Sequence, residues 1–277
     1  MSLIPASVMP HVRRFGFSGA IALSVIIVML FGINPVTVLT GKVSPPPAPT
    51  SITGVPPADA PLELVAAYPA VVAGEAELMW RRAFHLTAFK YPRISISVVS
   101  EASGFGCGMA GKDLTVFYCP ETQTVYADTA AYERLRRKHP AGADYAMAYL
   151  VAEAFGRHVQ WKLEYFDNLI AMRALDNPGA IEIFERQLGM QAACYAAMWT
   201  ITAGIDELLD DANVVDAVAT VEANRDRAIL DLPANRVIPE RLQRASFEAR
   251  KHWYDTGYAI PAPGSCALRK IQAASLS

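Results

Sequence analysis

The stretch from Tyr145 to Gln160 constrains the fold more than any other part of this 277-residue sequence. It is rich in Ala and also holds Met, Leu and Glu but no Pro, which is the composition of a helix. Five of its side chains recur at a spacing of three or four residues and therefore share one helix face. They are Tyr149, Leu150, Glu153, Arg157 and Gln160. The sequence thus predicts a helix on which an acidic side chain, Glu153, and a basic side chain, Arg157, lie one turn apart.

The N-terminal part holds a run of nineteen uncharged residues, Phe15–Ile33. At about 1.5 Å per residue this run can cross a bilayer as a helix. A cleaved signal peptide would usually have a shorter apolar region, about 7–15 residues, and no small-x-small cleavage site follows the run. We expect an uncleaved membrane helix over residues 15–35. Because Arg13 and Arg14 precede it, residues 1–14 should lie in the cytoplasm and the rest of the chain outside.

Residues 36–61 contain seven prolines among small residues. Such a segment has little to bury and predicts an extended, semi-rigid spacer. With 52% hydrophobic residues, the remaining residues 62–277 can form one well-buried domain or two small ones, and one domain is the simpler prediction. From Asp59 onward 22 basic residues face 27 acidic ones, a balance that argues against nucleic acid as a partner.

The domain is expected to be mostly helical with a small sheet. Arg93–Val99 alternates apolar and polar residues, as a half-buried strand does. Leu114–Cys119 and Thr124–Ala127 are two further strands, and Pro120–Gln123 between them predicts a hairpin turn. Besides the central helix, expected helices cover residues 75–89, 128–139 with Asp128 as cap, 180–203, 214–229 and 239–257. The charge-free run within 189–205 is too weakly apolar for lipid and predicts a buried core helix.

Several of these segments carry a resemblance. Val116–Asp128, with its Phe-Tyr-Cys-Pro, is followed by Ala148–Ala152 and by Gly156-Arg-His-Val-Gln160. The series resembles the bacterial membrane-anchored neutral zinc metallopeptidase family. Leu30–Pro35 is similar to the Leu-Phe-Gly-Ile-Asp-Pro that ends the membrane span in that family. The resemblance implies an α+β, zincin-like scaffold behind one membrane helix.

The family carries His-Glu-Val-Gly-His-His on its central helix, and this sequence departs from that motif. Glu153 stands at the first ligand His, Ala154 at the catalytic Glu and Arg157 at the second ligand His, while His158 matches the last His. A later family segment, Leu-Glu-Leu-Gln-Ala-Asp-Cys, supplies an acidic ligand. Here Gly189 and Ala193 replace its two carboxylates. None of the five His residues begins a His-x-x-x-His pair, so the resemblance implies a metallopeptidase scaffold whose metal site is degenerate.

A third family block, Ser-Phe-Thr-His-Gly before Arg-x-x-Trp, corresponds to residues 241–245 before Arg250–Trp253, and its His is also missing. We hypothesise that an ion pair of Glu153 and Arg157 fills the space of the zinc. The alternative is a solvent-facing helix pair of little energetic value. For His158, which has no second ligand nearby in the sequence, a structural hydrogen bond is favoured over a ligand role.

The four cysteines all lie on the predicted outer side, where disulfides persist. Three pairings are possible. Cys107 and Cys119 flank a Gly-rich turn and a strand, whereas Cys194 and Cys266 lie on a late helix and near the C-terminus, so we expect the pairs Cys107–Cys119 and Cys194–Cys266. A zinc site is disfavoured because no two of them are spaced as Cys-x-x-Cys.

Three functions remain open. The first is a catalytically inactive, membrane-anchored envelope protein that binds or assembles with a protein partner and needs no cofactor. The second is an active but atypical membrane-bound metallopeptidase that holds zinc with ligands other than the family's. The third is a structural partner of an active paralogue. The sequence identifies no substrate or partner.

Overall fold

The computed structural model describes residues 55–57, 59–85, 90–91, 93–100, 106–108, 114–174, 177–205, 208–229, 239 and 242–268. The expected membrane helix over residues 15–35 and most of the Pro-rich spacer lie outside these residues. Internal contacts divide the chain into two units, residues 1–48 with 81–91 and residues 49–80 with 92–277. In the first unit the rings of Phe84 and Tyr91 pack edge to face. The description below concerns the second unit.

Three strands form one small sheet, in the order β1, β3, β2. The strands are β1 (Ser95–Val99), β2 (Val116–Cys119) and β3 (Thr124–Asp128). β1 runs parallel to the central β3, and β2 pairs antiparallel with it. The β2–β3 hairpin turns at Pro120–Gln123, where Gln123 has a positive φ of 52°. The three predicted strands and the hairpin are confirmed.

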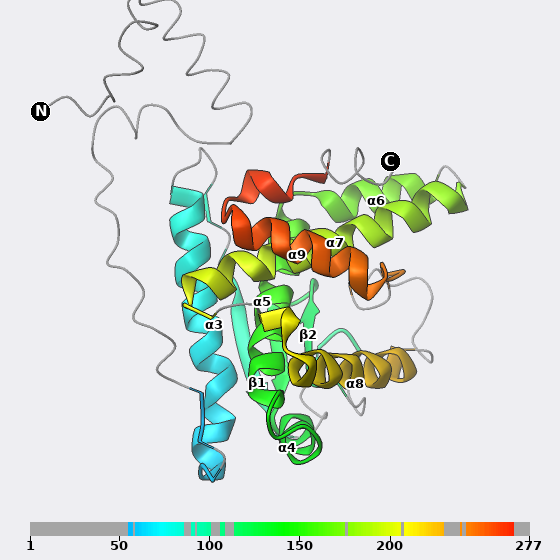
Figure 1. Ribbon diagram of the computed structural model, residues 1–277. Helices are drawn as coiled ribbons and strands as arrows, with labels where there is room; N and C mark the ends of the chain where they lie inside the picture. The colour runs from blue at the N-terminus through cyan, green and yellow to red at the C-terminus, as the bar shows by residue number, and fades with distance from the viewer. Residues whose placement is uncertain are drawn as a thin grey trace, which may run out of the picture. The chain divides into compact units, whose positions relative to one another are not determined.

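Helices make up most of the described chain, as expected of an α+β protein with a small sheet (Figure 1). They are α3 (Leu62–His85), α4 (Thr129–Lys138), α5 (Ala143–Lys162), α6 (Tyr165–Ala174), α7 (Pro178–Thr202), α8 (Ala212–Ile229) and α9 (Phe247–Ala259), with 3-10 turns η2 (Leu208–Asp210) and η4 (Pro263–Cys266). Asp128 caps α4 as predicted, because its Oδ1 accepts hydrogen bonds from the amides of Ala130 and Ala131.

The central helix α5 packs against β2, β3, α7 and α8, and α9 lies along α7 (Figure 1). Every residue of α5 from Ala146 to Gln160 is buried, so the helix is enclosed on all sides and not only on the face that its spacing indicated. α5 and α7 approach closely at Gly156, where an added Cβ would lie 3.1 Å from Tyr195 Cβ. The Gly of the family motif therefore has a packing role here.

Three helix predictions differ from the structure. α3 begins at Leu62 rather than Glu75 and continues through Pro69. A proline inside a helix costs about 3 kcal/mol, but the inward-facing Val65, Tyr68 and Val72 are buried around it, and this packing outweighs the local penalty. α6 was not predicted at all. α9 begins at Phe247 rather than 239, and its cap is Ser246, whose Oγ accepts from the Ala249 amide.

The last prolines of the spacer lie against the domain. The Arg136 guanidinium donates to the Pro57 carbonyl at 2.9 Å and to that of Pro56, and Pro56 is buried. Arg136 is itself held by Asp144, with Nε 2.9 Å from Oδ1. Within the described ranges, no helix combines the length and apolarity that a bilayer span requires. The charge-free part of α7 is a core helix, as predicted, since residues 187–200 are all buried.

Candidate functional site

Two positions at which the resemblance places ligand His residues, and one of the two candidate positions for the acidic ligand, lie close together in the structure. Glu153 and Arg157 lie one turn apart on α5. A Cβ added to Gly189 on α7 would lie 3.9 Å from Arg157 Nη2. Side chains from these two helices would therefore meet at one point, as a shared metal requires.

Arg157 and Glu153 form a buried ion pair. Arg157 Nη2 lies 3.3 Å from Glu153 Oε1, and Nη1 lies 3.4 Å from Gln160 Oε1. The two residues are only 7% and 6% exposed. The pair is therefore enclosed in the domain rather than solvent-facing. Removing one partner of such a pair is costly, because the other is left as an unpaired buried charge.

The space around this pair is small. The pocket beside it has a volume of about 10 Å³, room for about one water molecule. Its described walls come from β2, α5, α8 and residue 239. The lining residues are Val116, Phe117, Leu150, Glu153, Ala154, Arg157, Arg225 and Pro239. Ala154, at the position of the family's catalytic Glu, contributes only a methyl group to this wall.

The residues at these positions do not fit zinc. The Arg157 guanidinium cannot lose its proton and would repel the cation. Gly189 and Ala193 offer no side-chain donor. The carboxylate of Glu153 is then a single ligand at these positions, whereas zinc requires three or four. Over the ranges that the structure describes, no three or more His, Cys, Asp or Glu side chains gather as a metal site would need.

His158 faces the sheet. Its Nδ1 lies 2.9 Å from the Tyr118 hydroxyl, and the two rings pack edge to face with centroids 5.4 Å apart. His158 is 1% exposed. This contact joins α5 to β2 and fits the structural role that the sequence favoured.

A second ionic cluster, which the sequence did not reveal, surrounds Glu222 on α8. Arg244 Nη1 and Arg250 Nη2 lie 2.9 Å and 3.0 Å from Glu222 Oε2, and Arg225 Nη2 lies 3.9 Å from Oε1. Burial raises the pKa of the Glu222 carboxyl, but attraction to Arg250 and Arg225 outweighs it, so the pKa lies below the ordinary value of 4.5. Arg244 stands at the missing His of the third family block.

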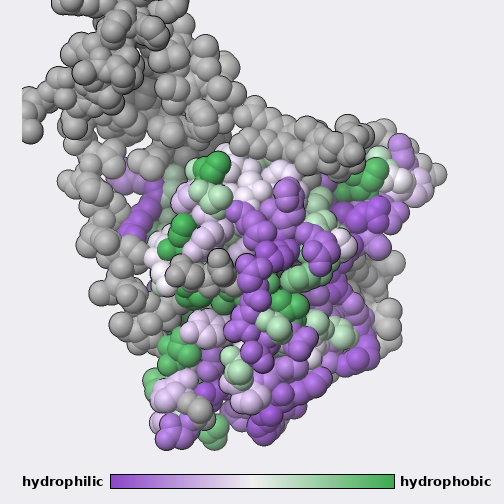
Figure 2. Space-filling model, in the orientation of Figure 1, coloured by the Kyte–Doolittle hydropathy of each residue, from purple (hydrophilic) through white to green (hydrophobic). Residues whose placement is uncertain are grey.

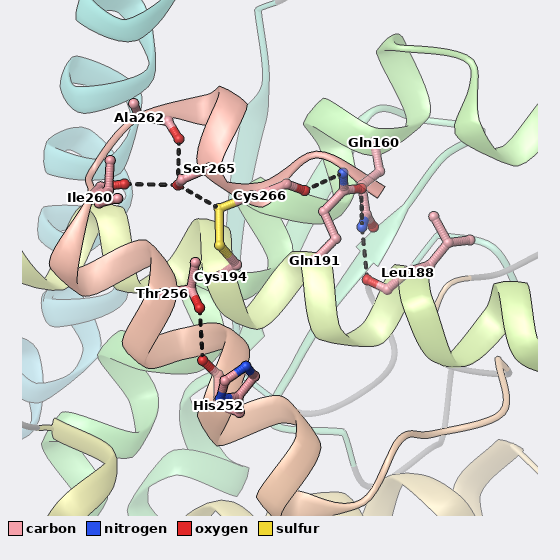
Figure 3. The surroundings of a disulfide bond; sticks show 10 residues. All are labelled: Gln160, Leu188, Gln191, Cys194, His252, Thr256, Ile260, Ala262, Ser265 and Cys266. Carbon is pink, nitrogen blue, oxygen red and sulfur yellow. Dashed lines mark hydrogen bonds between the residues drawn. A yellow bond between two sulfur atoms is a disulfide. The ribbon is translucent and has the colours of Figure 1, made fainter. Parts of the chain in front are cut away.

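A neutral hydrogen-bonded bridge joins α5, α7 and η4 (Figure 3). Gln160 Nε2 donates to the Leu188 carbonyl at 2.8 Å and to Gln191 Oε1 at 3.0 Å. Gln191 Nε2 in turn donates to the Cys266 carbonyl at 2.9 Å. The Cys194–Cys266 disulfide fastens the same end of the chain to α7. Both predicted disulfides are confirmed, since Cys107 is bonded to Cys119.

Comparison with known proteins places the chain. A family model described as putative neutral zinc metallopeptidase matches residues 10–268. The Escherichia coli (strain K12) protein YpfJ is 23% identical over 252 residues, 91% of this chain and 86% of its own length. The Mycobacterium tuberculosis (strain ATCC 25618 / H37Rv) protein Rv2575 is 30% identical over 189 residues, 64% of this chain and 62% of its own length. No solved structure matches. The resemblance seen in the sequence is confirmed, and the chain belongs to the putative neutral zinc metallopeptidase family.

Proposed function

We propose that this protein is a non-catalytic member of its family, a membrane-anchored envelope component that acts by binding or assembling with a protein partner. The observation that carries the proposal is Arg157. It occupies the second ligand position, is buried, and is paired with Glu153 at the first ligand position. A fixed positive charge thus lies where the metal of a peptidase would bind.

The chemistry of the family needs more than a metal. A zinc hydrolase uses two His and a third ligand to hold the ion, and a Glu to accept a proton from the bound water. At the base position this chain has Ala154. The neighbouring carboxylates are the buried Glu153 and the partly exposed Glu222, and both are engaged by Arg side chains. Neither is arranged to accept a proton from water.

The cellular location is argued from two features. All four cysteines are joined in disulfides, which persist in oxidising compartments outside the cytoplasm. The uncharged run from Phe15 preceded by Arg13 and Arg14 indicates an anchor with the same orientation. Both features support an extracytoplasmic domain tethered to the membrane.

Zinc content and peptidase activity test the proposal directly. We expect the purified full-length protein to hold no stoichiometric zinc and to show no peptidase activity that a chelator abolishes. About one zinc per chain, lost together with a measurable peptidase rate when Glu153 or His158 is replaced, would instead establish the alternative, an atypical metallopeptidase. The same assay on a relative that retains His-Glu-x-x-His serves as the positive control.

Rebuilding the motif tests whether Arg157 is what blocks the site. The full set of substitutions is Glu153→His, Ala154→Glu and Arg157→His with an acid at 189 or 193, and Gly189→Glu is chosen because position 189 lies beside Arg157. We expect this variant to bind zinc, because three ligands would converge at the point that the structure defines. The matched control keeps Arg157 and carries the other three substitutions. Equal zinc binding by the control and the full set would refute the blocking role of Arg157.

A further inference from the structure

Exposed apolar side chains gather on α3. Hydrophilic side chains predominate over α8 and α4 on the face drawn in Figure 2. Among the described residues seven large hydrophobic side chains are exposed, and four of them belong to α3. These four are Leu62, Leu64, Val71 and Leu78. Because soluble surfaces rarely concentrate apolar residues in this way, the outer face of α3 is a candidate contact surface.

Five of the exposed residues of α3 follow a heptad spacing. Leu64, Ala67, Val71, Gly74 and Leu78 are separated by steps of three and four residues, and all five are exposed. We call this set the α3 seam. It contains no charge, and a Cβ added to Gly74 would meet no atom within 4 Å. Pro69 lies on the opposite, buried face. A repeat of 3.5 residues is the pattern by which one helix packs against another.

We propose that the α3 seam is the docking surface for a second copy of this chain, which contacts it through its own α3 seam in a twofold pair. The partner of a heptad seam is a helix with the same repeat, and α3 itself provides one. A two-fold contact places the same patch on both subunits. Since the seam is uncharged, two identical copies meet without like-charge repulsion, and Ala67 and Gly74 leave room for the helices to approach.

The size of the seam argues for pairing between tethered copies. α3 has 24 residues and is about 36 Å long at 1.5 Å per residue. One face of such a helix is smaller than the roughly 800 Å² per partner that stable soluble complexes bury. The 54 residues before Val55 precede α3 in the chain and include the expected membrane helix. Two copies held in one membrane would meet at a high effective concentration, which compensates for a small interface.

Cysteine cross-linking of the full-length protein in intact expressing cells tests the pairing. The native cysteines are all in disulfides, so a Val71→Cys variant has one free thiol, at the centre of the seam. We expect an oxidant to convert it to a disulfide-linked dimer. The matched control is Ile183→Cys on α7, 51% exposed and outside the seam. Equal dimer yields from the two variants would overturn the proposal.

A second substitution distinguishes specific pairing from chance collision. In the Val71→Cys background, Leu78→Glu places a charge in the seam and should reduce the dimer yield at least about tenfold. Ile183→Glu in the same background should leave the yield unchanged. Three results would overturn the proposal: a yield that is insensitive to Leu78→Glu, a cross-linked species with the mass of another protein, and a thiol shielded by lipid from water-soluble reagents. None of these results depends on whether the protein binds zinc.

Discussion

Two adjoining regions of the α5–α7 interface, which meet at the Arg157–Gln160 hydrogen bond, differ in what they retain of the family. Gln160, Gln191 and Cys194 match the family and join α5, α7 and the C-terminal turn η4. Glu153 and Arg157 stand where the resemblance places the ligand His residues, Gly189 stands at one of the two positions for the acidic ligand, and none of the three matches. The first region holds the helices together with neutral hydrogen bonds and a disulfide. These contacts join α5, α7 and η4 through residues other than those at the ligand positions.

The second region has its own physical constraint. A carboxylate buried without a counter-charge is strongly unfavourable. Glu153 therefore requires a nearby cation, and the guanidinium of Arg157 provides it at 3.3 Å. A Cβ at Gly189 would lie 3.9 Å from Arg157 Nη2, an ordinary van der Waals contact, so only a longer side chain at this position would compete with the guanidinium for space. The three replacements thus form a consistent set.

The largest effect is expected from Arg157→Ala. It removes the ion-pair partner of the buried Glu153 and leaves only the longer-range attraction of Arg250, and we expect a loss of about 3–5 kcal/mol in the free energy of unfolding. The matched control is Arg186→Ala, which breaks the i,i+4 ion pair between Arg186 and the exposed Glu182. This variant should lose about 0.5 kcal/mol or less in the free energy of unfolding. Denaturant unfolding of both variants measures the difference.

Replacing both members of the buried pair sharpens the same comparison. The double variant Glu153→Leu with Arg157→Leu removes both charges and should lose much less stability than Arg157→Ala alone. Similar losses for Arg157→Ala and Arg186→Ala would show that the pair does not hold this region together.

A smaller loss of stability is expected from Gly257→Ala, because Gly257 on α9 contacts Cys194 in the region that matches the family. An added Cβ at this position of α9 would lie 2.1 Å from the Cys194 carbonyl oxygen, so α9 must move away from α7. We expect a loss of about 3 kcal/mol. Gly179→Ala is the control, because its nearest atom is 3.9 Å away, and it should change stability by less than about 0.5 kcal/mol. A tolerated Gly257→Ala would mean that the α7–α9 contact is looser than the structure shows.

The sequence predicted the structural features that have local signals and did not predict those that depend on tertiary packing. The Pro120–Gln123 hairpin and the Asp128 cap have short-range signals, and the structure contains both. The N-terminal half of α3 was missed because Pro69 is a helix breaker by propensity, and only its buried neighbours explain why the helix continues. The convergence of Arg157 and Gly189 followed from the resemblance. The Glu222 cluster also includes Arg244 and Arg250, 22 and 28 positions away from Glu222, and no spacing rule connects these two residues to it.

An intermediate effect is expected from Gln191→Leu. The substitution removes the donor to the Cys266 carbonyl and one acceptor of Gln160, so a buried carbonyl is left without this partner. We expect a loss of about 1–3 kcal/mol. Gln243→Leu, at an exposed position, should lie within about 0.5 kcal/mol of the wild type. Equal stability of the two variants would show that the bridge does not help to hold the scaffold together.

The smallest effect is expected from the acid titration of Glu222. Its pKa in the folded protein lies below the ordinary 4.5, since Arg250 and Arg225 outweigh the effect of burial. A carboxyl with a lowered folded pKa adds stability that is fully present above its unfolded pKa and is lost as pH falls through the folded pKa. The denaturant midpoint for unfolding of the wild type should therefore decrease as the pH is lowered below about 4.5.

Glu222→Gln should lower stability at pH 7 and flatten this acid dependence, because the amide does not titrate. Glu182→Gln, at the exposed pair, should leave the slope unchanged. The slope is that of the free energy of unfolding against pH. If the slopes of the wild type and Glu222→Gln coincide, the charge of Glu222 does not stabilise the fold. The Glu153–Arg157 pair would then be the ionic interaction that distinguishes the region around Arg157 from the region joined by Gln160 and Gln191.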